Sequence, residues 1–191
     1  MDNPNAKSSL LTFLYRPAYS MRQFLDSGRG HGAALLVATI FGIIQFSRLL
    51  PLPAKSKPEE LLLYLALCGF CGIVSLFLFG WLMRNFGRWF GAETEQRRVR
   101  TALGLGLLPW TALFAILFLM LYYGINPKLI ATEYFPVFLG LFVYGFCILL
   151  LSLTAALRLG VITTFLCIVV TIIFGVIPLM LLAQVLVSYL K

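Results

Sequence analysis

Five long apolar runs dominate this sequence, and they constrain its fold more than any other feature. A helix needs about 20 apolar residues to cross a hydrocarbon layer of about 30 Å, because each residue advances it by about 1.5 Å. A segment at that depth must also satisfy its own backbone hydrogen bonds, which a helix does. The sequence therefore predicts an all-α integral membrane protein with five transmembrane helices, at about residues 32–50, 61–83, 102–123, 134–157 and 161–189.

The composition limits the chemistry that such a protein can perform. Of its 191 residues, 61% are hydrophobic and 12% are charged, whereas a soluble domain has roughly 45–50% apolar and 25% charged residues. The seven acidic residues lie mostly outside the apolar runs, and the one histidine, His31, stands between glycines at the start of the first run. Because no acid or serine is placed to complete a catalytic group with His31, the sequence predicts a protein that is not an enzyme and that binds no cofactor or metal.

The 15 lysines and arginines predict an orientation. Ten of them fall on one side of the predicted spans and five on the other. Since lysine and arginine accumulate in cytoplasmic loops, this distribution places the amino terminus in the cytoplasm and the carboxyl terminus outside. The formal net charge of +8 is thereby assigned to membrane topology, and we expect no nucleic-acid partner.

Residues 1–31 precede the first span and are too polar to cross the membrane. On a helical wheel the apolar residues form one face, and the polar residues Thr12, Arg16, Tyr19 and Gln23 lie opposite. Pro17 is expected to divide this amphipathic segment. Two interpretations remain open: a helix in the cytoplasmic interface that binds anionic headgroups through its arginines, and a cover packed onto the helix bundle. The apolar face is made by Leu10, Leu14, Pro17, Met21, Phe24 and Leu25.

Residues 81–101 form a basic and aromatic loop after the second predicted span. Gly91 is placed to end the preceding helix, and a cluster of arginines then opens the next span. Arginines beside tryptophan and phenylalanine are typical of a membrane interface, where they set topology and contact lipid phosphates. The alternative is a docking surface for an acidic partner protein. The candidate docking residues, with those of the amino-terminal segment, are Arg16, Arg22, Arg84, Arg88, Arg97, Arg98 and Arg100.

The CGFC motif at residues 68–71 is the most chemically suggestive pattern in the sequence. Cys68 and Cys71 are three residues apart on a helix, and Gly69 and Gly72 stand beside them in an apolar run. Small residues at this spacing are typical of close helix packing. A redox or metal site would need basic neighbours or further ligands. We therefore interpret these two cysteines and two glycines as packing residues. The alternative is a thiol redox site formed by Cys68 and Cys71. Every cysteine of the chain is expected to be a free thiol.

Two prolines and three polar residues interrupt the apolar runs. Pro109 in the third span and Pro178 in the fifth are expected to kink their helices and to face inward, where protein can satisfy the freed carbonyl groups. Gln45, Arg48 and Gln184 are the strongly polar groups at membrane depth. None of the apolar runs carries a buried acid, which argues against proton-coupled transport.

The order of these features resembles the Yip (Ypt/Rab-interacting protein) family in its compact bacterial form. The resemblance rests on three phrases, LYRPAYSMRQFLDSG, GWLMRNFGRWFG and RTALGLGLLPW, and on an amino-terminal helix followed by five spans. It implies a Yip-like membrane domain over residues 32–191 and a place in the bacterial cytoplasmic (inner) membrane. The matching positions are Pro17, Gly87, Gly91 and Pro109, and none has a catalytic role. Eukaryotic members bind small GTPases in membrane traffic, but their DLYGP motif is absent here.

The sequence thus supports one leading hypothesis for function. It is a non-enzymatic membrane scaffold or adaptor that organises anionic lipids or a partner protein at the cytoplasmic face, where the basic loop and the amphipathic segment lie. The alternative is a small-solute channel or transporter formed by a homo-oligomer. In that case glycines at positions 69, 72, 104, 106, 140 and 145 would allow close helix approach.

Overall fold

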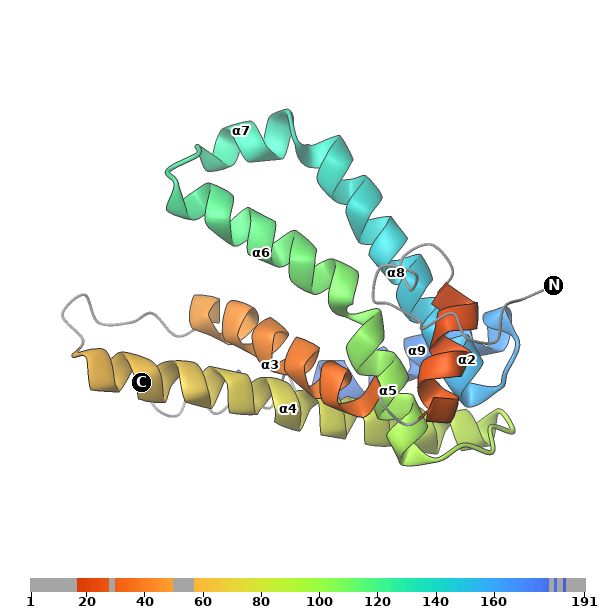
Figure 1. Cartoon of the computed structure of the whole chain (residues 1–191). Helices are drawn as coiled ribbons and strands as arrows, with labels where there is room; N and C mark the ends of the chain where they lie inside the picture. Colours follow the sequence, from red (N-terminus) through yellow and green to blue (C-terminus); the bar gives the residue numbers. More distant parts are fainter. Residues whose placement is uncertain (1–16, 28–29, 50–56, 179–180, 182–183, 185–191) are drawn as a thin grey trace.

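The computed structural model describes residues 17–27, 30–49 and 57–178 together with Leu181 and Gln184. This part of the chain is helical and contains no β-strand (Figure 1). Leu10, Leu14 and Arg16 of the predicted amphipathic segment lie outside the described residues. The helices are α2 (Pro17–Ser27), α3 (Gly30–Leu49), α4 (Pro58–Trp89), α5 (Gln96–Gly106), α6 (Leu108–Tyr122), α7 (Pro127–Thr132), α8 (Phe135–Leu157), α9 (Val161–Thr171) and the π-helix η1 (Ile172–Val176).

Four helical stretches are long and apolar enough to cross a membrane: Gly30–Ser47, Pro58–Trp89, Gln96–Tyr122 and Phe135–Leu157. They coincide with the first four predicted spans, as an all-α membrane protein requires. In the fifth predicted span, the apolar helix Val161–Gly175 is shorter, and most of the residues after Pro178 lie outside the described part. Five spans and the orientation therefore stay predictions.

Helix α4 extends beyond the predicted span at both ends. Its 32 residues correspond to about 48 Å, well above the hydrocarbon thickness of about 30 Å. Pro58 occupies the first turn, and the Lys57 N–H donates to Glu60 Oε2 at 3.3 Å. At the other end Gly91 has φ +83° and the Ala92 N–H donates to the Gly87 carbonyl at 2.9 Å. This glycine-dependent termination confirms that Gly91 ends the helix.

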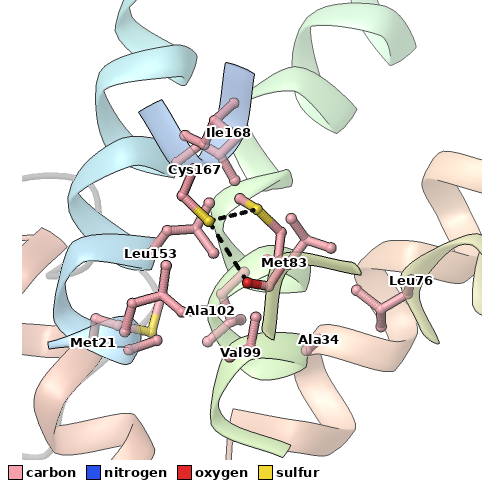
Figure 2. Close-up of a cluster of buried hydrophobic side chains, with 14 of the residues drawn as sticks. Met21, Ala34, Leu76, Met83, Val99, Ala102, Leu153, Cys167 and Ile168 are labelled. Carbon is pink, nitrogen blue, oxygen red and sulfur yellow. Dashed lines mark hydrogen bonds between the residues drawn. The ribbon is translucent and has the colours of Figure 1, made fainter. Parts of the chain in front are cut away.

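The helices form two arms that diverge from a common base (Figure 1). Helices α3 and α4 lie side by side as one arm, and α6, α7 and α8 form the other. The base gathers α2, α5, α9 and the carboxyl-terminal part of α8, and it contains the buried core. Figure 2 shows Met21, Val99, Leu153 and Cys167, each 0% exposed, meeting there from four different helices.

The arm of α3 and α4 is held together by a glycine contact. A β-carbon on Gly42 would lie 2.5 Å from the Cα atom of Gly72 and 2.7 Å from the Cys68 carbonyl oxygen. Cys68 and Gly69 are also buried at this crossing, but Cys71 is exposed, contrary to the expectation that both thiols pack. Three residues rotate a helix by about 300°, so Cys71 is displaced by about 60° and leaves the contact.

The predicted irregularity at Pro109 is present as a break between α5 and α6 at Leu107. Pro109 is half-buried and faces α8, where its Cβ lies 3.4 Å from the position of a β-carbon on Gly145. Pro178 differs from expectation because it is exposed. It follows the π-helix Ile172–Val176, whose wider turn shifts the carbonyl partners just before the proline.

Candidate functional site

Three arginines from separate segments converge on one pocket at the base of the bundle. Arg22 of α2, Arg98 of α5 and Arg158 at the end of α8 line a cavity of about 460 Å³. The rest of its wall is mainly aliphatic. No acidic side chain is among the described residues that line it. The other lining residues are Leu25, Leu151, Thr154, Ala155 and Leu159.

Arg22 is positioned by the packing of α2 onto α8 and α5. Met21 is 0% exposed and Ser20 is 1% exposed, while Tyr19 on the other side of the helix is 55% exposed. Figure 2 shows the Met21 side chain directed into the core. The described part of the amphipathic segment is therefore packed onto the bundle through its apolar face, and Arg22 remains exposed beside it.

Arg158 is held in an unusual backbone conformation. Among the described residues it is the one non-glycine position with a positive φ, at 56°, and it caps α8 with its N–H donating to the Thr154 carbonyl at 3.0 Å. Glycine is the usual residue in this left-handed position, because a β-carbon there costs roughly 1–2 kcal/mol. A strained position occupied by a charged side chain is a reason to assign that side chain a function.

The chemistry of this arginine pocket suits an anion attached to an apolar body. A guanidinium group stays charged at all physiological pH values and matches phosphate oxygens with its planar set of donors. The leucines beside it suit the hydrocarbon part of the same molecule. The pocket therefore has the features of a lipid phosphate site.

Arg84 and Arg88 lie on α4 near the loop before α5. Arg84 Nε donates to the Thr94 carbonyl at 3.3 Å, and Thr94 Oγ1 donates to the Ala156 carbonyl at 2.8 Å, which ties the loop to α8. Arg88 is exposed and lines a separate pocket of about 490 Å³ that also contains Glu93 and Glu95. Arg84 thus supports the fold of the loop, and Arg88 lies beside acids.

The side chain of Arg100, from α5, extends across α4 and is half-buried. Its guanidinium carbon lies 4.2 Å from the centre of the Phe77 ring, and its Nε donates to the Gln96 carbonyl at 3.4 Å. The aliphatic part of the side chain passes over Gly80, where a β-carbon would collide with Arg100 Cγ. This residue joins α5 to α4. Arg97, about one turn before Arg100 in α5, is exposed and lies outside the arginine pocket.

His31 differs from the expected exposed imidazole. It is half-buried at the start of α3, and its Nδ1 atom is buried without a hydrogen-bond partner in the described part of the chain.

Cys167 is a core residue that its sequence context did not single out. Its Sγ lies 3.7 Å from the Met83 carbonyl oxygen and 4.0 Å from Met83 Sδ (Figure 2).

A second and larger cavity, of about 680 Å³, lies between the two arms. Gln45 of α3 reaches it, whereas Gln184 is not among the described residues that line it and is exposed. Most of the walls are aliphatic or aromatic, which does not suit the hydrated solutes of a channel. Within the described ranges, no cluster of three or more His, Cys, Asp or Glu side chains could hold a metal ion.

Arg48 lies within α3. The sequence does not predict Arg158 as a docking residue, since its charge contributes there only to the predicted orientation. The one sequence signal for a role of Arg158 is its position directly after the last apolar residue of the predicted span 134–157. With the geometry of both cavities established, the chain was compared with known proteins. No family model, no curated protein and no solved structure matches it.

Proposed function

We propose that this protein is a non-enzymatic membrane scaffold that binds anionic phospholipid at the arginine pocket, and so organises lipids or partner proteins on that face. One observation carries the proposal: Arg22, Arg98 and Arg158 converge on a pocket whose remaining wall is mainly aliphatic. Three guanidinium groups supply charge and hydrogen-bond donors for a phosphate.

Two sequence features support this proposal. The distribution of lysine and arginine predicts that the base of the bundle faces the cytoplasm, where anionic lipids attract basic side chains. The resemblance to the compact bacterial Yip family suggests a role in membrane organisation and a location in the cytoplasmic (inner) membrane. The missing DLYGP motif argues against a small GTPase as the partner.

Lipid retention in nanodiscs tests the proposal. The protein is reconstituted in an equal mixture of phosphatidylglycerol and phosphatidylcholine, then extracted gently, and the retained lipids are quantified by mass spectrometry. We expect enrichment of phosphatidylglycerol on the wild type. Loss of the charges in Arg22→Gln, Arg98→Gln and Arg158→Gln combined is expected to remove that enrichment, because each charged hydrogen bond contributes roughly 1.5–3 kcal/mol.

The matched control is Lys128→Gln, compared with Arg98→Gln alone. Lys128 is exposed on α7, in the arm formed by α6, α7 and α8, so its loss removes one charge without changing the arginine pocket. The lysine variant is expected to retain phosphatidylglycerol like the wild type. Equal enrichment on the wild type and the triple variant, with both folded, would exclude the pocket as the lipid site.

A further inference from the structure

The larger cavity, here called the central cavity, is a partly open space between the two arms and is separate from the arginine pocket. Its volume of about 680 Å³ equals that of about 20 water molecules in the liquid. Closed voids in protein interiors are rarely larger than one water molecule, whereas this partly open space is large enough to admit a ligand. It also falls within the roughly 300–1,000 Å³ of small-molecule sites. Its walls include Phe41, Phe46, Phe79, Trp110, Phe146 and Leu149.

The central cavity is elongated along the helices. Its lining extends along α4 from Gly72 to Met83. These two positions are 11 residues apart, which corresponds to about 16 Å along a helix and to about half of the hydrocarbon thickness of a bilayer. A long apolar space at membrane depth fits a hydrocarbon chain better than it fits a compact solute.

Three side chains in the wall are polar, and one of them is available to a ligand. Ser75 Oγ donates to the Cys71 carbonyl at 2.8 Å, and Thr171 Oγ1 donates to the Cys167 carbonyl at 2.8 Å. Gln45 is half-buried, and no described residue forms a hydrogen bond with its side chain. A primary amide has two N–H donors and a carbonyl acceptor, and leaving them unpaired in an apolar environment is unfavourable.

We propose that the central cavity binds the hydrocarbon chain of a long-chain carboxylic acid or a similar amphiphile, whose polar end group hydrogen-bonds to Gln45. The apolar walls hold the chain, and the single unpaired amide fixes which end of the molecule lies near the carboxyl-terminal end of α3. The inference is independent of the arginine pocket. The two sites use different residues of α8, with Phe146, Leu149 and Leu153 lining the central cavity.

Photocrosslinking tests this assignment. The probe is palmitic acid with a diazirine in the chain and an alkyne for enrichment, added to the full-length protein in phosphatidylcholine nanodiscs. We expect label on Phe79 and Phe146, which line the cavity, and we expect excess unlabelled palmitic acid to compete for it. A phosphatidylcholine that carries the same diazirine chain distinguishes a free amphiphile from bilayer phospholipid as the source. Absence of competable label from both probes would overturn the proposal.

Two substitutions on the same helix give a matched comparison. Ser75→Phe places a ring in the central cavity and is expected to abolish competable labelling. Val74→Phe places the same ring on an exposed face of α4, outside the cavity lining, and is expected to leave labelling unchanged. Equal labelling in both variants would show that the probe binds the outer surface and would exclude the central cavity.

Gln45→Leu separates the polar contact from the fold, since it keeps the volume of the side chain. We expect the affinity for palmitic acid to fall about tenfold, the effect of one lost hydrogen bond. The affinity for a diazirine-bearing hexadecane, which has no polar group, is expected to stay unchanged. Equal affinity of the wild type and Gln45→Leu for the acid would remove Gln45 from the site.

Discussion

At the scale of single residues, the charged side chains divide into two groups with different roles. Arg84 and Arg100 form contacts within the protein, to the Thr94 carbonyl and to the Phe77 ring. Arg22, Arg98 and Arg158 line the arginine pocket. The sequence identified four of these five as candidates because of their charge. Their different roles depend on neighbours that are distant in the chain, and a sequence pattern does not contain those neighbours.

Arg158 offers a test in which stability and binding change in opposite directions. Arg158→Gly relieves the cost of a β-carbon at φ 56°, so we expect unfolding to become about 1 kcal/mol less favourable. The same change removes a guanidinium from the arginine pocket, so retention of phosphatidylglycerol should fall. Thermal unfolding in detergent and lipid mass spectrometry measure the two effects.

Arg158→Ala is the control for this prediction. It removes the charge but keeps a β-carbon in the left-handed conformation. Lipid retention should fall as far as in the glycine variant, without the gain in stability. If both variants kept wild-type lipid retention, Arg158 would be strained for a reason unrelated to lipid.

At the scale of helices, local sequence signals determined where several elements begin and end. Pro58 and Glu60 start α4, and Gly91 ends it. Which residues join one helix to another was seen only in the tertiary structure. Gly145 accommodates the ring of Trp110, whose Nε1 donates to the Phe142 carbonyl at 3.1 Å, and this joins α6 to α8. No spacing rule pairs residues 32 positions apart, so the sequence did not indicate this contact.

The crossing of α3 and α4 makes a prediction at this scale. Gly72→Leu is expected to destabilise the protein by about 3 kcal/mol or more, because the new side chain would overlap the backbone of Ala38 and Gly42. Gly140→Leu is the matched control, since no atom lies within 4 Å of a β-carbon there. Unfolding in a mixed detergent titration compares the two. Similar midpoints for both variants would contradict the close packing of α3 on α4.

At the scale of the whole molecule, the orientation in the membrane can be tested directly. The loop between α4 and α5 and the start of α7 lie at opposite ends of the molecule (Figure 1). Glu93 in that loop and Asn126 before α7 are both exposed. In a cysteine-free background, Asn126→Cys is expected to react with a membrane-impermeant maleimide in intact cells. Glu93→Cys is expected to react only after the membrane is opened. The reverse labelling pattern would overturn the predicted orientation.

The sequence by itself determined that the chain is helical and built for a membrane. Hydropathy and backbone hydrogen bonding act within one segment, so about 20 consecutive residues contain the whole signal for a spanning helix. Only the tertiary structure decided that Arg22, Arg98 and Arg158 share a pocket and that Gln45 faces the central cavity. Those arrangements depend on the angles between helices, which side-chain packing sets. Leucine, phenylalanine and glycine occur in each of the four long apolar stretches, so the residue types alone do not show which helix faces pack together.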